Sequence, residues 1–190
     1  KVNSLRCTQD HNRGVDISFL KRVELFLSML KLEESFITEF VIRDVGNILD
    51  RSFLNYPPVL ISDSLMEVLN KLSEKINICI TSNTGITSPS IYYEFLENIG
   101  LKSIFNEIFL SNELMVAKPN IKIFEIVSSH FNLKPKDCLH IGDNLFTDIF
   151  GANNSKFKSI WINNKNKLFD NDIKPNCTIR NITDIEKLLI

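Results

Sequence analysis

The chain has 190 residues, enough for one domain, or one domain with an insert, and for a substantial hydrophobic core. Its 44% hydrophobic and 24% charged residues are typical of a globular protein, and no apolar run approaches the roughly 20 residues that would span a bilayer. The formal net charge of −1 gives no electrostatic reason to expect a nucleic acid or an anionic membrane as a partner. Four cysteines without a CxxC pair or a zinc-like spacing indicate reduced thiols, and we expect a cytoplasmic protein.

The first third of the chain is predicted to be helical. Over residues 16–54, apolar side chains recur at spacings of three and four, as in Phe19, Val23 and Leu27, which is the pattern of an amphipathic helix. The pattern divides this region into three helices, near residues 19–30, 36–41 and 45–53. The Tyr-Pro-Pro segment at 56–58 ends the pattern, because proline lacks the backbone amide and restricts the residue before it.

Strands and helices alternate over the rest of the chain. The predicted strands are short apolar runs at residues 76–81, 108–110, 138–141, 158–162 and 177–179. The predicted helices have amphipathic spacing and lie at residues 64–75, 90–99, 121–131, 147–153 and 182–189. This alternation predicts an α/β fold with a parallel, doubly wound sheet. A helical segment therefore precedes an α/β segment.

Three polar segments are predicted to lie at one edge of this sheet, because ligands of open α/β sheets bind at the carboxyl ends of the strands. The first is the run of hydroxyls, amide and glycine at 82–85, which suits an anion or merely forms a turn. The second is Lys118, which precedes a proline-initiated helix and is either a phosphate-binding cation or a solvated side chain. In the third, an apolar strand ends in a glycine, and Asp143 and Asp148 follow. Such carboxylates either bind Mg²⁺ or belong to an ordinary turn and helix start.

In this order and spacing, the three segments resemble motifs of the haloacid dehalogenase-like hydrolase superfamily. The family's second motif is similar to Ile78-Cys-Ile-Thr-Ser-Asn83. The segment that carries its third-motif lysine is similar to Val116-Ala-Lys-Pro-Asn-Ile-Lys-Ile-Phe124. Its fourth motif is similar to His140-Ile-Gly-Asp-Asn-Leu-Phe-Thr-Asp-Ile-Phe-Gly-Ala152. The resemblance covers residues 57–190 and implies a Rossmann-like parallel sheet with helices on both faces. Residues 1–57 resemble the α-helical cap that one large subgroup inserts after its first motif, which leaves 58–190 as the core.

The resemblance implies hydrolysis of a small phosphorylated substrate through an aspartyl-phosphate intermediate, with Mg²⁺ as the cofactor. Ser82 would hydrogen-bond a phosphate oxygen, and Asn83 would help to position the substrate. Lys118 would pair with the phosphate and with the nucleophilic carboxylate. Asp143 would bind the metal, while Asp148 would orient Lys118 or a metal-bound water. Preorganised charge of this kind supplies most of the catalysis of phosphoryl transfer.

One part of the family pattern is absent from the chain. The family's first strand ends in Asp-x-Asp, which supplies the nucleophile and the general acid/base, and no such sequence follows an apolar run here. Asp10 and Asp16 lie in a polar stretch, and residues 1–8 contain too few apolar side chains for a central strand. Without that strand, the strands of the second and fourth motifs would face each other across a gap with unpaired edges. We therefore expect the first motif to lie upstream of Lys1, and the chain alone to be catalytically incomplete.

Two alternatives remain open beside the phosphatase: an inactive binding or assembly module with the same fold, and a metal-independent haloacid dehalogenase. The presence of Lys118, Asp143 and Asp148 argues against the first, since a module does not need them. His140 lies in a predicted strand and is interpreted as a packed core residue rather than a base. Three charged residues of the cap are interpreted as a solvated helix face: Arg43, Asp44 and Arg51. The sequence pattern identifies neither the substrate nor an oligomeric state.

Overall fold

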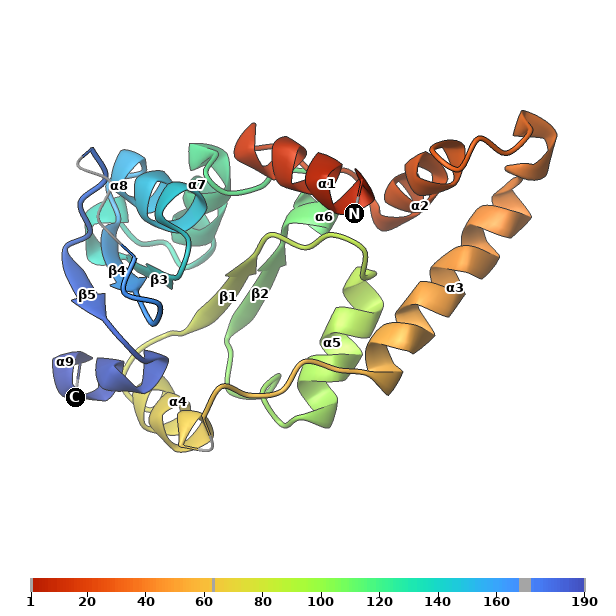
Figure 1. The fold of residues 1–190 in the computed structure, drawn as a ribbon. Coiled ribbons are helices and arrows are strands. Elements are labelled where there is room, and N and C mark those ends of the chain that lie inside the picture. The colour runs from red at the N-terminus through yellow and green to blue at the C-terminus, as the bar shows by residue number, and fades with distance from the viewer. Residues whose placement is uncertain (1, 63, 168–171, 190) are drawn as a thin grey trace.

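The computed structural model describes residues 2–62, 64–167 and 172–189. Its α-helices are α1 (Val2–Asn12), α2 (Phe19–Ser28), α3 (Glu39–Asn55), α4 (Leu65–Ser73), α5 (Pro89–Asn98), α6 (Ser111–Leu114), α7 (Ile121–His130), α8 (Gly151–Asn154) and α9 (Glu186–Leu189). Its strands are β1 (Cys79–Ser82), β2 (Glu107–Leu110), β3 (Leu139–Gly142), β4 (Lys158–Ile162) and β5 (Cys177–Ile179). Shorter turns are 3-10 helical at Glu34–Phe36, Pro135–Asp137 and Ile182–Ile185, and π-helical at Leu145–Phe150. Helices come first, and strands and helices alternate after α4 (Figure 1).

Helices α2 and α3 pack against each other through the apolar faces that the sequence predicts. Phe19, Val23 and Leu27 are buried between them. The side chains of Ser18 and Thr38 cap the two helices by accepting backbone N–H groups of the first turn. The second and third predicted helices form one helix, α3, because no proline or glycine separates them. Figure 1 shows this pair extending away from the strands.

Helix α1 is a departure from the sequence analysis, which expects no helix over residues 2–12. Its polar composition hides the pattern, and its stability comes from tertiary contacts rather than from propensity. Cys7 is buried, and α1 contacts the π-helical turn that follows β3. After a turn at Gly14, whose φ is +75°, Val15 forms an antiparallel bridge with Val116. This segment is thereby attached to the α/β part, while the division of the chain at residue 57 stays a prediction.

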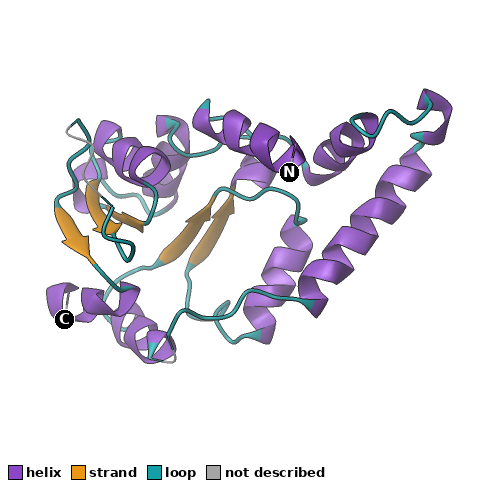
Figure 2. Cartoon of the chain, in the orientation of Figure 1, coloured by secondary structure: helices purple, strands orange, loops and turns teal. Residues whose placement is uncertain are grey.

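The strands form two parallel sheets rather than one. In the first, β1 pairs with β2, so that Cys79 lies opposite Glu107 and Ser82 opposite Leu110. In the second, the order is β3-β4-β5, and Gly142 lies opposite Trp161. Every pair is parallel, as the alternation of strands and helices predicts. Figure 2 shows the two groups of strands side by side and separate.

The facing edges of β1 and β3 do not pair with each other, which confirms the gap expected from the sequence. Between them lies a cavity of about 830 Å³, lined by both strands and by α4 and α7. The side chains contributed by β1 and the residue before it, by β3 and by α7 are largely apolar: Ile78, Ile80, Leu139, Ile141, Phe124 and Val127. We call this cavity the interstrand groove. Its two walls carry backbone groups of strand edges, which are templates for pairing with a further strand.

Helices cover both faces of the strands, as expected for the fold class. On one face, Phe124 of α7 is buried in a core with Phe109 and Phe157. On the other, Val68 and Leu72 of α4 pack with residues of β4, β5 and the C-terminal turn. Burial of these side chains away from water supplies most of the driving force for the fold. Among the described residues, no helix is long and apolar enough to cross a membrane.

Candidate active site

Lys118 lies between the carboxyl ends of β1 and β3 and joins them. Its Nζ donates a hydrogen bond to the carbonyl oxygen of Thr81, at 2.6 Å, and pairs with Oδ1 of Asp148, at 2.8 Å. Lys118 and Asp148 are both buried, so these contacts replace the water that an ammonium and a carboxylate would otherwise bind. Lys118 and Asp148, two of the five site residues predicted from the sequence, are thus in direct side-chain contact at the edge of the strands.

Asp148 is held as an ionised carboxylate. Its Oδ1 contacts Nζ of Lys118 and Nε2 of His140, and its Oδ2 accepts a hydrogen bond from the backbone N–H of Asn144 at 3.0 Å. Burial alone would raise the pKa of Asp148, but the hydrogen bond from His140 and the charge of Lys118 outweigh it and hold this pKa well below its usual range. Both oxygens are therefore engaged, and Asp148 is better suited to orient Lys118 than to bind a metal directly.

The last residue of β3, Gly142, has to be a glycine because no side chain fits at this position. A Cβ atom at this position would overlap the carboxylate of Asp148, which packs directly over the glycine. Asn144 then starts the π-helical turn, and its side-chain oxygen accepts the backbone N–H groups of Phe146 and Thr147. The glycine and the asparagine together fold Asp148 back over the end of the strand.

The two predicted substrate-binding residues, Ser82 and Asn83, lie at the end of β1. The amide of Asn83 bonds the backbone of Lys118 on both sides: its Oδ1 accepts the N–H and its Nδ2 donates to the carbonyl, each at 2.8 Å. Asn83 therefore supports Lys118, and its contact with a substrate stays a prediction. The hydroxyl of Ser82 has no hydrogen-bond partner within the part of the chain that the structure describes, which leaves it available to a ligand.

Asp143, the predicted metal ligand, follows β3 and has an exposed side chain. Its backbone carbonyl accepts the indole N–H of Trp161 at 3.1 Å, which anchors the loop while leaving the carboxylate free of that contact. Over residues 2–62, 64–167 and 172–189, no cluster of three or more His, Cys, Asp or Glu side chains could hold a metal ion. The residues nevertheless fit Mg²⁺, which commonly takes one or two protein carboxylates and completes its shell with water and phosphate oxygens.

His140 has a contact that the sequence analysis did not anticipate. It packs in β3 as predicted, with its ring edge-on to Phe124 and the centroids 5.3 Å apart. Its Nε2 also lies 3.1 Å from Oδ1 of Asp148. Burial lowers the pKa of His140, and the charge of Lys118 lowers it further, which outweighs the hydrogen bond to Asp148. This contact is therefore a hydrogen bond from a neutral ring rather than an ion pair.

A second buried polar cluster surrounds Asp16, and we call it the Asp16 cluster. Oδ1 of Asp16 pairs with Nη2 of Arg22 at 2.6 Å, and Oδ2 accepts the hydroxyl of Ser111 at 2.6 Å and contacts Nε2 of His11 at 3.0 Å. The other terminal nitrogen of Arg22, Nη1, donates to Oδ2 of Asp10 at 2.8 Å. Both aspartates thus pair with Arg22 and not with Lys118. These contacts are consistent with neither aspartate being the nucleophile.

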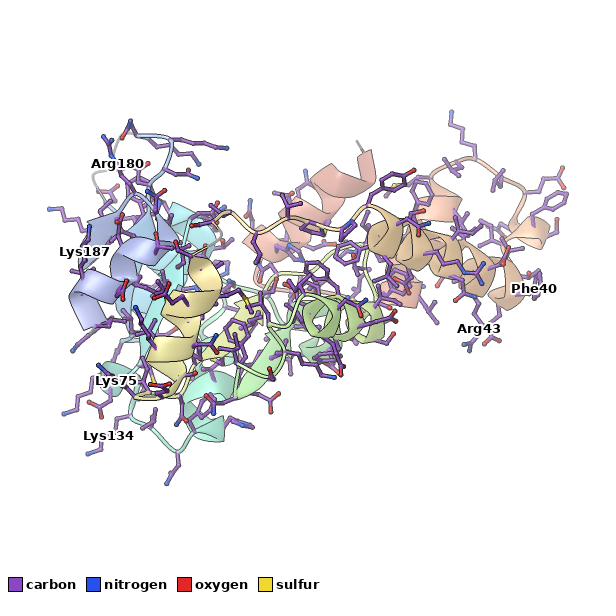
Figure 3. The ribbon with its side chains drawn as sticks, turned by 90° about the horizontal axis from the view of Figure 1, so that it is seen from below. Phe40, Arg43, Lys75, Lys134, Arg180 and Lys187 are labelled. Carbon is purple, nitrogen blue, oxygen red and sulfur yellow. The ribbon has the colours of Figure 1, made fainter. Side chains whose placement is uncertain are left out.

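The three charged residues interpreted as a solvated helix face are exposed: Arg43, Asp44 and Arg51. Arg43 pairs with Glu39 on an exposed face of α3. Figure 3 shows Phe40 and Arg43 projecting from the outer end of the helix, away from the strands. Four other basic residues, Lys75, Lys134, Arg180 and Lys187, are labelled at the opposite end of the molecule in the same view. The interpretation of Arg43 as part of a solvated helix face fits this placement.

Parallel strands with helices on both faces, and a buried lysine–aspartate pair where the strands end, define the Rossmann-like α/β class. The chain belongs to the haloacid dehalogenase-like hydrolase family, because the model of that family matches residues 22–162. The crystal structure of a 2-haloacid dehalogenase from Pseudomonas syringae has the same fold, with a TM-score of 0.69 at 18% identity over 90% of this chain and 69% of that one. Both findings confirm the predicted family and fold class.

Two relatives named as phosphate-ester hydrolases share part of the sequence. The chain is 35% identical over 81 residues to glyceraldehyde 3-phosphate phosphatase of Pyrococcus furiosus, an alignment that covers 41% of this chain and 34% of the relative. It is 33% identical over 95 residues to a pyrimidine 5′-nucleotidase of Escherichia coli, covering 50% of this chain and 42% of the relative. The chain therefore spans less than half the length of these two relatives.

Proposed function

We propose that this chain forms most of the active site of a Mg²⁺-dependent phosphohydrolase that acts on a small phosphorylated metabolite. The observation that carries the proposal is the placement of the Lys118 ammonium, bound by Thr81 and Asp148 where β1 and β3 end. A fixed cation at the edge of a parallel sheet is suited to a phosphoryl group, whose charge it offsets in the ground state and the transition state. The phosphatase and nucleotidase names of the two relatives support a phosphate ester as substrate.

Each of the five site residues has a role in this proposal. The Ser82 hydroxyl donates to a phosphate oxygen, and Lys118 pairs with the phosphate and with the nucleophilic carboxylate. Asn83 and Asp148 hold Lys118 through its backbone and its ammonium, respectively. Asp143 is the residue that would bind Mg²⁺. When bound, the metal offsets the charge of the transferring phosphoryl group.

The covalent step requires a carboxylate beside Lys118. Within the described residues, Asp10 and Asp16 are bound to Arg22 instead. The interstrand groove suggests where that carboxylate comes from, because a strand that pairs with the free edges of β1 and β3 would end next to Lys118. We infer that such a strand, from a segment beyond residues 1–190, carries the Asp-x-Asp nucleophile and acid.

The proposed chemistry has two balanced steps. A carboxylate oxygen of the first Asp attacks phosphorus, the ester P–O bond breaks, and the second Asp gives a proton to the leaving oxygen. Water, deprotonated by the same second Asp, then attacks the aspartyl phosphate and releases inorganic phosphate. Lys118 stabilises the carboxylate and the phosphoryl oxygens in both steps.

All four cysteines are free thiols, which supports a cytoplasmic location for the proposed enzyme.

Phosphate release by the full-length protein tests the proposal. We suggest glyceraldehyde 3-phosphate, pyrimidine 5′-monophosphates and p-nitrophenyl phosphate as substrates, each with Mg²⁺ and with EDTA. We expect Lys118→Met to lower kcat by about 100-fold or more, and Asp143→Asn to raise the Mg²⁺ concentration needed for half-maximal activity. Lys122→Met, at an exposed position on α7, is the matched control and should leave activity unchanged.

Three results would overturn the proposal. Halide release from 2-haloacids without any metal, together with no phosphate release, would identify a dehalogenase. Phosphate release that persists in EDTA and in Lys118→Met would place the chemistry elsewhere in the protein. A folded full-length protein that does neither reaction would be a binding or assembly module.

A further inference from the structure

Two donors converge on one oxygen of Asp148. Nε2 of His140 lies 3.1 Å and Nζ of Lys118 lies 2.8 Å from Oδ1. The other oxygen, Oδ2, accepts the backbone N–H of Asn144. Because an ionised carboxylate only accepts hydrogen bonds, Nε2 of His140 must carry the proton in this contact. The carboxylate is thus fixed in one orientation, with its Oδ1 turned toward Lys118.

We propose that His140 is a positioning residue of this site: a neutral imidazole whose Nε2–H holds Asp148, so that Asp148 in turn holds the ammonium of Lys118. The inference rests on the proposed phosphohydrolase function. His140 does not need to touch the substrate, because it acts through Asp148. Its effect is preorganisation: Lys118 is in place before the charge of the transition state develops.

Packing restricts the imidazole to this pose. Only 13% of the His140 side chain is exposed. Phe124 of α7 lies edge-on to the ring at an interplanar angle of 85°, and Phe124 is itself buried. The charged groups that face the ring are Lys118 and Asp148, while Phe124 is apolar. A protonated ring would place a second cation beside Lys118 in a buried site, which is unfavourable. These surroundings favour the neutral ring.

Substitutions that separate hydrogen bonding from packing test the role. His140→Gln places an amide donor near the position of Nε2, whereas His140→Leu keeps the volume and removes the donor. In the full-length protein with its best phosphate ester, we expect His140→Leu to lower kcat by about 10- to 100-fold with KM changed less than about threefold. His140→Gln should recover most of that loss. His130→Leu and His130→Gln, at a half-exposed position on α7, are the matched controls and should both be neutral.

The pattern of loss distinguishes positioning from packing. If the ring only filled space against Phe124, His140→Leu would be tolerated at least as well as His140→Gln. Equal activity of His140→Leu and wild type would overturn the proposal, as would equal losses in both variants. In an Asp148→Asn background, His140→Leu should cause little further loss, because both substitutions act on the same contact. A full additional loss in that background would show that His140 does not act through Asp148.

A second measurement is independent of turnover. Nitrogen-15 NMR of the imidazole groups in the wild-type protein should show His140 as the neutral Nε2–H tautomer throughout pH 6 to 8. An imidazolium or an Nδ1–H tautomer in that range would overturn the proposal. If the wild-type protein hydrolyses no phosphate ester, the proposed function fails, and this spectrum still decides whether His140 donates to Asp148.

Discussion

The side-chain amide of Asn83 bonds both backbone polar groups of Lys118, its Oδ1 accepting the N–H and its Nδ2 donating to the carbonyl, at 2.8 Å each. The two residues are 35 positions apart and belong to segments that follow β1 and β2. A lysine side chain has four rotatable bonds, so fixing its backbone reduces the freedom that its ammonium must lose. The end of β1 therefore controls where the cation of the neighbouring segment is placed.

Replacement of Asn83 by leucine should weaken this placement. The N–H and the carbonyl of Lys118 would lose their partners, and an unsatisfied buried group costs about 1–3 kcal/mol. We expect a loss of about 2 kcal/mol in urea unfolding and a fall in kcat larger than the change in KM. The control is Asn98→Leu, at an exposed position at the end of α5. An Asn83→Leu protein with wild-type kcat would contradict this account.

Gly142→Ala should damage the site from the opposite side. The added methyl group would overlap the carboxylate of Asp148 and force that side chain away from Lys118. Overpacking of this kind costs about 1–3 kcal/mol, and kcat should fall by about tenfold or more because the lysine loses its partner. The measurements are thermal unfolding and steady-state kinetics. Gly46→Ala in α3, far along the chain from this pair, serves as the control and should keep wild-type kcat.

Because Arg22 and Asp16 form a buried ion pair, we expect the effects of replacing them on the unfolding free energy to be non-additive. The side chains are 1% and 0% exposed, so removing Asp16 leaves the buried guanidinium of Arg22 with Asp10 as its ionic partner. Asp16→Ala should cost about 3–5 kcal/mol of unfolding free energy, whereas the double variant with Arg22→Met should cost much less than the sum of the single changes. Urea unfolding of the four proteins gives the coupling directly. Lys21→Met, which breaks an exposed pair with Glu24, should shift stability by less than about 1 kcal/mol.

Deprotonation of His11 is expected to lower the stability of the fold as the pH rises to about 9. Burial lowers its pKa, but the hydrogen bonds to Asp16 and Cys7 outweigh this effect and raise the pKa to about 9. A raised pKa means that protonated His11 favours the folded state. Its contribution is complete below the unfolded-state value of about 6.5 and is lost as the pH rises to about 9.

Thermal unfolding between pH 6 and pH 10 should therefore show a fall in Tm that His11 causes. A shift of this size corresponds to at most about 3 kcal/mol, or several degrees for a chain of this length. His11→Gln should be less stable than wild type near pH 6 and should lose this part of the pH dependence. Parallel curves for the two proteins over the whole range would rule out His11 as the cause.

The fold and the lysine–aspartate pair were accessible to sequence reasoning because each depends on local pattern. Apolar runs bounded by turn residues located β1 and β3, and the residues just past their ends are brought together by the topology of any parallel sheet. Asp143 and Asp148 therefore follow from their positions after β3, whereas Lys118 follows α6 and was indicated by the proline after it. The cofactor and the substrate stay predictions, since they rest on resemblance and on what these side chains could bind.

The Asp16 cluster and the role of His140 were not accessible in the same way. Asp16 and Ser111 are 95 positions apart, and no local pattern in either segment indicates the other. Helix α1 is polar, so its contacts with distant segments rather than its own periodicity determine that it forms. For His140 there was one usable signal: as residues two apart in a strand, His140 and Gly142 point to the same face, where Asp148 folds back.

The interstrand groove implies an order of events during folding. Each half-sheet is made of segments that follow one another, residues 79–110 in one and 139–179 in the other, so each closes only short loops. A strand inserted between them from outside these segments makes contacts that are remote in sequence, and such contacts form slowly. In a full-length protein with the proposed strand, the two halves should therefore acquire protection from hydrogen exchange before that strand, and the site at Lys118 should become rigid last.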